Sequence, residues 1–158
     1  MSSFQSRPGG SAGQHQAAQA RSRDTFYRGA AAGLTVLIVD DDPRNRFALT
    51  ALLQRGGVTV LEATGGAGAL ETLAQRADID IVLMDIMMPV MDGYQTIAAI
   101  RKRPACRELP IIAVTAKEAD GERARCIAAG ASDYISKPIN ASELLSALSY
   151  WLPATAAA

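Results

Sequence analysis

Short apolar segments and longer segments with helical spacing alternate five times between residues 34 and 152. Three of the apolar segments are almost wholly apolar, as interior strands of a parallel sheet are. Such an alternation predicts an open parallel sheet with helices on both faces. The predicted strands are 34–39, 58–63, 79–84, 110–115 and 132–136, and the predicted helices are 67–76, 93–103, 118–130 and 140–152, with a first helix between Asp42 and Gly56.

Capping signals support two of these helices. Asp42 can cap the first helix, which would have Pro43 at its first position and would end at the Gly56-Gly57 pair. Asn140 and Glu143 stand at the spacing of a capping box at the start of the last helix.

Composition limits the class of protein. The chain has 158 residues, of which 49% are hydrophobic, so we expect one domain with a real core at 34–152. It contains neither an apolar run long enough to span a membrane nor a signal peptide, so we expect a cytoplasmic protein without a membrane partner. Its two cysteines, Cys106 and Cys126, lack metal-ligand spacing and are interpreted as reduced structural thiols.

The first 33 residues differ from the rest. They are rich in Ser, Gly, Gln and Arg and have little to bury, so residues 1–33 are predicted to be a disordered tail, with an organellar transit peptide as an alternative. Four arginines against one aspartate give this tail a charge of +3, and the neutral total leaves −3 for the remainder. Such a body is no evident nucleic-acid binder. Residues 153–158 form a second short tail.

Polar residues stand where the predicted strands end. Three aspartates (40–42) follow the first strand, Asp85 follows the third, Thr115 ends the fourth, and Lys137 follows the fifth. Taken singly, each has an ordinary explanation as a cap, a strand end or a surface lysine. Together they fall on one edge of the sheet, and sites form beyond the carboxyl ends of parallel strands.

The chemistry of these groups is complementary. Clustered carboxylates repel one another unless a proton or a cation joins them, and an all-oxygen set suits Mg²⁺. A lysine supplies a compact positive charge for a phosphate oxygen. Asp85 could therefore act as a nucleophile toward phosphorus and form an acyl phosphate.

Four motifs carry a family resemblance: "VLIVDDDPRN", "LMDIMMPVMDG", "IIAVTA" and "DYISKP". With them, the chain from about Leu34 to Leu152 resembles the receiver domain of two-component response regulators, in the style found in hybrid histidine kinases. The resemblance implies a flavodoxin-like (βα)5 fold, a doubly wound parallel sheet with strand order 2-1-3-4-5.

The resemblance also implies an acceptor and a metal site. Asp85 would be the phosphorylated aspartate and would bind Mg²⁺ together with Asp41. The backbone carbonyl of Met87 would be a third protein ligand, and Asp40 would support the metal mostly through water.

A switch is implied as well. Thr115 and Lys137 match the hydroxyl and the lysine that sense the phosphoryl group. Tyr134 matches the aromatic residue that reorients with the threonine, although a half-buried tyrosine that never switches is the alternative. The Lys137–Pro138 bond would be cis. Met87 and Lys117 would flank the path of attacking water, and because neither is a good general base at neutral pH, we expect slow self-dephosphorylation.

The expected partners follow from the same resemblance. The phosphoryl donor would be a sensor histidine kinase or a histidine phosphotransfer protein, because the chain's one histidine, His15, lies in the tail. The candidate donor-docking residues are Arg44, Asn45, Phe47 and Ala48, with Phe47 either exposed for this role or part of the core. A downstream protein would bind the face formed by 118–130, 132–136 and 140–152, where Arg123 and Arg125 could form surface pairs. Nothing after 152 suggests an output domain or direct DNA binding.

Three other interpretations were weighed. The chain could be a receiver fragment of a hybrid histidine kinase that passes phosphate to a phosphotransfer domain, or a protein-interaction module that is never phosphorylated. A phosphatase of the haloacid dehalogenase type would need a second carboxylate two residues after the nucleophile, where this chain has Met87. We therefore expect a signalling phosphoacceptor that catalyses only its own phosphorylation and dephosphorylation, and not an enzyme in the wider sense.

Overall fold

The computed structural model describes residues 33–116 and 120–151, which form one five-stranded parallel sheet. The expected N-terminal tail up to residue 32, Lys117 and the expected C-terminal tail lie outside the described residues. The strand order is β2-β1-β3-β4-β5, which confirms the predicted order. The strands are β1 (Thr35–Val39), β2 (Thr59–Ala63), β3 (Ile81–Asp85), β4 (Ile111–Thr115) and β5 (Asp133–Ser136).

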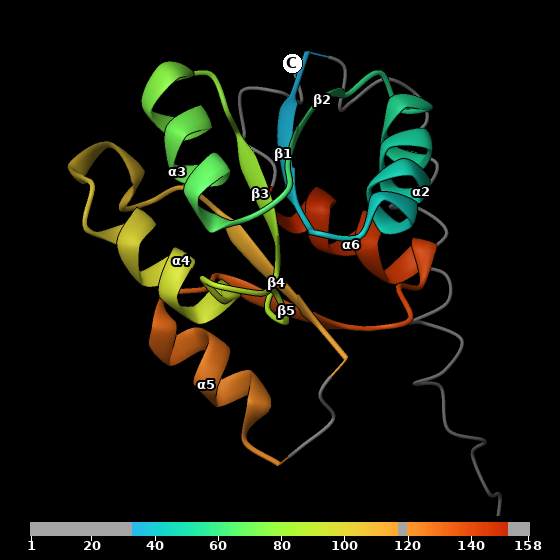
Figure 1. The fold of residues 1–158 in the computed structure, drawn as a ribbon. Helices are drawn as coiled ribbons and strands as arrows, with labels where there is room; N and C mark the ends of the chain where they lie inside the picture. Colours follow the sequence, from blue (N-terminus) through green and yellow to red (C-terminus); the bar gives the residue numbers. More distant parts are fainter. Residues whose placement is uncertain (1–32, 117–119, 152–158) are drawn as a thin grey trace, which may run out of the picture.

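Helices cover both faces of the sheet (Figure 1). The helices α2 and α6 lie on one face, and α3, α4 and α5 lie on the other. This arrangement confirms the doubly wound, flavodoxin-like fold. The helices are α2 (Pro43–Gln54), α3 (Gly66–Gln75), α4 (Gly93–Arg101), α5 (Glu122–Ala129) and α6 (Ala141–Trp151), with a short 3-10 helix η2 (Pro104–Cys106).

Two hydrophobic clusters result, one on each face. The alternation of side chains along a strand sends Leu37 and Val39 of β1 toward α3 and α4, and sends Val36 and Ile38 toward α2 and α6. All residues of β1, β3 and β4 are buried, as expected for interior strands. The sheet is therefore packed against helices on both faces.

The predicted cap of α2 forms, and the predicted capping box of α6 forms in part. The Asp42 side chain accepts a hydrogen bond from the backbone N–H of Arg44, and Pro43 is the first residue of α2. The Asn140 side chain accepts from the backbone N–H of Glu143 at the start of α6, which is one of the two bonds of a capping box. A full capping box between Asp92 and Gln95 at the start of α4 was not predicted.

Two local details differ from the predictions. The helix predicted at 118–130 is assigned from Glu122, because Gly121 just before it has φ +86°, a left-handed conformation that favours glycine. The short helix η2 was not predicted, since three residues carry too little periodicity. Cys106 and Cys126 are both buried and free, in agreement with structural thiols.

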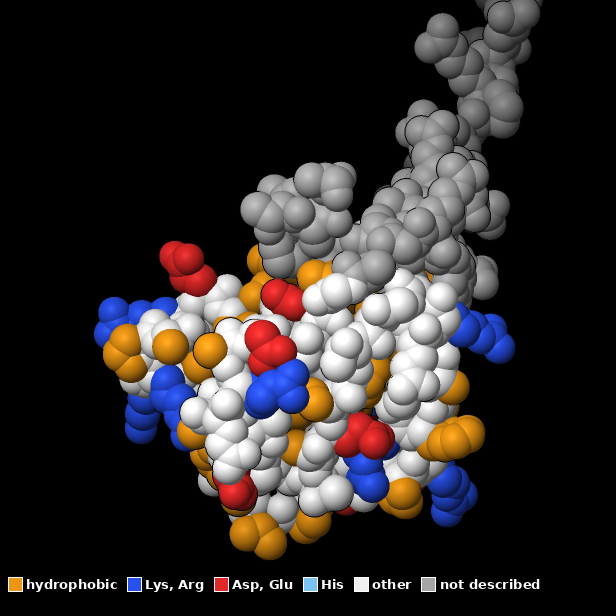
Figure 2. Space-filling model, turned by 90° about the horizontal axis from the view of Figure 1, so that it is seen from above, with side chains coloured by type: hydrophobic (Ala, Val, Ile, Leu, Met, Phe, Trp, Pro, Cys, Tyr) orange, Lys and Arg blue, Asp and Glu red, His pale blue; other side chains and the backbone are white. Residues whose placement is uncertain are grey.

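Surface charge is mixed on the face seen in Figure 2, where acidic and basic side chains lie next to one another over the described residues. No field of one sign marks this face for a polyanion. Among the helices of residues 33–116 and 120–151, none is long and apolar enough to cross a membrane.

Candidate functional site

Three carboxylates meet at the carboxyl edge of the sheet. Asp40 and Asp41 directly follow β1, and Asp85 is the last residue of β3. Because β1 and β3 are paired in parallel with Val39 opposite Met84, their ends lie side by side. One oxygen from each carboxylate lies within 4.8 Å of the others. Asp40 and Asp85 are each 3% exposed, whereas Asp41 is exposed and leaves the cluster open to solvent.

Asp85 is held by two donors. Its Oδ1 accepts from the Lys137 ammonium at 3.2 Å and from the backbone N–H of Met87 at 3.2 Å. Burial raises the pKa of Asp85 from its ordinary value of 3.8 to about 6, and the negative charge of Asp40 adds to this rise. Lys137 and the Met87 N–H act in the opposite direction.

The donor set fits a hard divalent cation. Among the described residues, Lys137 is the cation that pairs with this cluster, at 3.2 Å from Asp85 and 3.7 Å from Asp40. Three carboxylates against one ammonium leave an excess of negative charge, and all the ligand atoms are oxygens. This is the ligand chemistry that Mg²⁺ prefers.

Thr115 and Lys137 reach the same edge from the neighbouring strands. Thr115 ends β4 and is fully buried, and its carbonyl accepts from the backbone N–H of Lys137 at 2.8 Å. The Lys137–Pro138 bond is cis, as the resemblance implied. Tyr134 lies further back on β5 and packs half-buried against the core beneath α3, α4 and α5.

Gly93 explains why α4 can begin so near the end of β3. A Cβ at this position would lie 2.4 Å from the Asp85 carbonyl oxygen and 2.6 Å from the Ile86 Cα, both backbone atoms that cannot give way. In the loop that joins β3 to α4, Val90 takes φ +68° and is fully exposed, and the Met87 side chain is 55% exposed. At the glycine of the motif "MDG", any side chain would therefore clash with the backbone at the end of β3.

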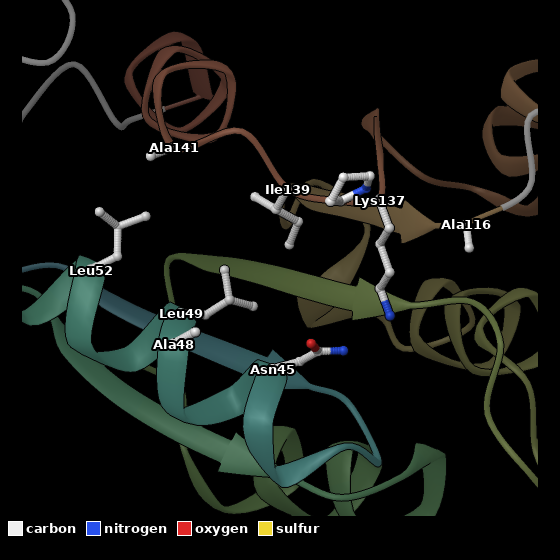
Figure 3. A pocket seen from close by; sticks show the side chains of 9 residues that line it. Asn45, Ala48, Leu49, Leu52, Ala116, Lys137, Ile139 and Ala141 are labelled. Carbon is white, nitrogen blue, oxygen red and sulfur yellow. The ribbon is translucent and has the colours of Figure 1, made fainter.

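A mostly apolar groove of about 510 Å³ adjoins this edge (Figure 3). One wall is α2, and the other is the segment from Lys137 to Ala141. Of the predicted docking residues, Asn45 and Ala48 line the groove, and Phe47 is 78% exposed, which excludes the alternative that it belongs to the core. The groove is lined by Asn45, Ala48, Leu49, Leu52, Ala116, Lys137, Pro138, Ile139 and Ala141.

Sequence reasoning missed two polar arrangements near the site. Arg46 donates to the Asp40 carbonyl at 2.8 Å and pairs with Glu62 of β2 at 3.6 Å. On the other face, Tyr94 of α4 donates to the buried Glu122 of α5. The pairs Arg46–Glu62 and Tyr94–Glu122 join elements distant in sequence, and nothing in the local pattern distinguishes such residues from solvated ones.

Arg125 makes a contact that was not predicted. It is exposed, as expected for surface pairing, and its guanidinium also lies over the Tyr94 ring, 4.5 Å from the ring centroid. A cation over an aromatic face contributes about 0.5–1 kcal/mol at exposed sites. Arg125 therefore also helps to hold α5 against α4.

Comparison with known proteins places this geometry in a family. Residues 36–149 match the family model of the response regulator receiver domain. The protein PilH of Pseudomonas aeruginosa is 37% identical over 110 residues, which are 70% of this chain and 90% of PilH. The sensor protein GacS of Pseudomonas syringae pv. syringae is 40% identical over 119 residues, which are 73% of this chain but only 13% of GacS.

A solved structure has the same fold. The receiver domain of the sensor histidine kinase PA1611 from Pseudomonas aeruginosa, with a magnesium ion coordinated in its active site cleft, is 37% identical with a TM-score of 0.70. The match covers 76% of this chain and 98% of that one. The structural match agrees with the strand order observed here, and the magnesium ion in that structure agrees with an acidic cluster at this edge. This chain belongs to the response regulator receiver domain family.

Proposed function

We propose that this chain accepts a phosphoryl group on Asp85 from the phosphohistidine of a sensor histidine kinase or a histidine phosphotransfer protein, with Mg²⁺ at the acidic edge. The observation that carries the proposal is the Asp85 carboxylate, buried at the end of β3, bonded to Lys137 and adjacent to two further aspartates. It would catalyse only its own phosphorylation and dephosphorylation.

The reaction is a phosphoryl transfer between two proteins. An oxygen of Asp85 forms a bond to phosphorus while the phosphorus–nitrogen bond of the phosphohistidine breaks, and the electron pair stays on the imidazole nitrogen. Mg²⁺, when bound, neutralises charge on the phosphoryl oxygens. Lys137, already 3.2 Å from Asp85, would pair with one of those oxygens.

Individual roles follow for the remaining residues. Asp41 and Asp85 would bind the metal directly with the Met87 carbonyl, and Asp40 would support it through water. Thr115 would donate its hydroxyl to the phosphoryl group, and Tyr134 would reorient with it. Met87 and Lys117 would tune dephosphorylation and, lacking a general base, would leave it slow.

The groove beside α2 is our proposed docking surface for the donor. It opens next to Lys137 and is mostly apolar. Phe47 of α2 and Met87, two residues after β3, expose apolar side chains. A donor helix that buries such residues could bring its histidine to Asp85. For the signal to a downstream protein, we propose the face formed by α5, β5 and α6.

The identity with GacS favours a second candidate, in which the chain passes the phosphoryl group onward to a histidine phosphotransfer domain. The match covers 90% of PilH, so in that relative a receiver makes up almost the whole protein, and this favours the first candidate. Transfer of labelled phosphate from the phosphorylated chain to a purified phosphotransfer domain would separate these two.

Beryllofluoride, a tetrahedral analogue of the phosphoryl group, provides the test. In NMR spectra of the full chain, we expect shifts at Thr115, Tyr134 and Lys137 that need both beryllofluoride and Mg²⁺. Asp85→Asn should abolish them. Asp92→Asn is the matched control, because asparagine also caps a helix and Asp92 lies outside the cluster.

Two results would overturn the proposal. One is an intact fold without any response to beryllofluoride and Mg²⁺, which would favour an interaction module that is never phosphorylated. The other is a response that persists in Asp85→Asn, which would move the acceptor to another residue.

A further inference from the structure

Asp40 is fixed by three hydrogen bonds. Its backbone N–H donates to the Ala63 carbonyl at 3.1 Å, and its Oδ1 accepts from the backbone N–H of Asp42 at 2.8 Å. Its carbonyl accepts from Nη1 of Arg46 at 2.8 Å. The third bond comes from a side chain, so it can be removed by mutation without altering the backbone.

The bond from Arg46 acts on Asp41 as well. The Asp40 carbonyl belongs to the peptide unit that joins Asp40 to Asp41, and that unit is planar. Holding the carbonyl oxygen therefore sets the orientation of the unit, including the N–Cα bond of Asp41, and so restricts the directions that the Asp41 side chain can take. Asp41 needs such support, because it is the exposed member of the cluster.

Arg46 is itself held in place. Its Nε lies 3.6 Å from Oε1 of Glu62 on β2, and the Arg46 side chain is only 17% exposed. Glu62 also accepts a weak hydrogen bond from Thr50 of α2. The guanidinium thus bridges the first turn of α2, the end of β1 and the edge strand β2, and Glu62 offsets part of its charge.

We propose that Arg46 is a positioning residue for the acidic cluster, which sets the Asp40–Asp41 peptide so that the Asp41 carboxylate faces the cation. This inference rests on the proposed Mg²⁺ site. The direction of the change in Mg²⁺ affinity on removing Arg46 distinguishes this role from a purely electrostatic one. A guanidinium acting only through its charge would repel Mg²⁺, so its removal would strengthen binding. A guanidinium that orients a ligand gives the opposite result.

The experiment measures the dissociation constant of Mg²⁺ alone, by NMR titration of the full chain without a phosphoryl donor. Arg46→Ala should bind Mg²⁺ about tenfold more weakly, the size seen when a group that orients a metal ligand is lost. Arg46→Gln, which can still donate to a carbonyl but has no charge, should lie between Arg46→Ala and the wild type. Arg55→Ala is the matched control, an exposed arginine at the far end of α2.

Each result has a defined meaning. Weaker binding in Arg46→Ala with unchanged binding in Arg55→Ala supports the positioning role. Equal or tighter binding in folded Arg46→Ala overturns it and leaves the proposed function standing. If Arg46→Ala does not fold, the Mg²⁺ dissociation constant of Arg46→Gln is interpreted in the same way: weaker binding supports the positioning role, and equal or tighter binding overturns it. A wild-type chain that does not bind Mg²⁺ overturns the metal site of the proposed function and this inference together.

Discussion

The two ends of the sheet hold their charged side chains in opposite ways. At the amino end, the Arg101 guanidinium donates to the carbonyls of Gly130, Cys106 and Leu109 and to the Ser132 hydroxyl, at 2.6–3.2 Å. Within the described residues it forms no ion pair. At the carboxyl end, three carboxylates share one ammonium and leave an excess of negative charge.

The difference separates structural charge from charge that awaits a ligand. Each nitrogen of Arg101 donates to a neutral acceptor, either a backbone carbonyl or the Ser132 hydroxyl, so this cation connects α4 to the starts of β4 and β5 without an anionic partner. The acidic edge has the opposite balance, since like charges are held together and one of them, Asp41, faces solvent. Burial of a charge alone does not mark a site. An uncompensated excess of charge does.

The largest expected effect lies at the amino end. Arg101→Ala should lower the free energy of unfolding by about 3 kcal/mol, because it leaves several partly buried carbonyls without donors. Its Mg²⁺ affinity should be unchanged. Urea denaturation measures the first quantity, with Lys102→Ala as the exposed control on the same turn of the chain. A loss as small as that of the control would mean that the guanidinium contributes little beyond its contacts with solvent.

At the carboxyl end, a substitution should stabilise. Without divalent ions at pH 7.5, Asp85→Asn should raise the free energy of unfolding by about 1–2 kcal/mol, because it removes a buried carboxylate that Asp40 repels. The lost contact with Lys137 offsets part of the gain. A decrease in stability, measured by the same denaturation, would show that the pairing with Lys137 outweighs burial and repulsion.

The pH dependence of wild-type stability tests whether the ionised form of Asp85 destabilises the folded state. Burial raises the pKa of folded Asp85 from 3.8 to about 6, so between these values the folded state binds more protons than the unfolded state. This contribution to stability is therefore present at low pH and is lost as the pH rises through 6. The difference between Asp85→Asn and the wild type should grow over the same range.

The sequence predicted the carboxyl end better than the amino end, for a physical reason. The residues of the acidic edge stand at strand ends, and parallel strands bring their carboxyl ends together, so Asp40, Asp41 and Asp85 could be placed without coordinates. Arg101 and Arg46 donate to backbone carbonyls, at Gly130 and Asp40 among others, and a backbone acceptor leaves no trace in the pattern of side chains. The start of α5 was misplaced because its predicted span included Gly121.

Mg²⁺ should stabilise the protein only by binding at the carboxyl end of the sheet. At about ten times its dissociation constant, Mg²⁺ should stabilise the wild type by about 1.4 kcal/mol through binding to the folded state. Arg101→Ala should gain the same increment from its lower baseline, whereas Asp85→Asn should gain much less. Thermal or urea unfolding with and without Mg²⁺ measures this. Equal increments in all three proteins would place the cation away from the acidic edge.

Glu122 gives the smallest expected effect and tests how far this comparison extends. Glu122 is a buried carboxylate, as Asp85 is, but it accepts from the Tyr94 hydroxyl and lies 3.8 Å from the Cys126 thiol. Burial, and then the bond to Glu122, raise the pKa of Tyr94, so its phenol stays a donor well into the alkaline range.

Tyr94→Phe should therefore cost about 1 kcal/mol of unfolding free energy at any pH from 6 to 9, since one hydrogen bond to a buried carboxylate is lost. It should leave the Mg²⁺ dissociation constant unchanged, because Glu122 lies outside the acidic cluster. Tyr150→Phe is the control, since Tyr150 is 78% exposed. A change in Mg²⁺ affinity in Tyr94→Phe would mean that the contact between α4 and α5 is coupled to the acidic edge, and that a carboxylate with satisfied partners can still tune the site.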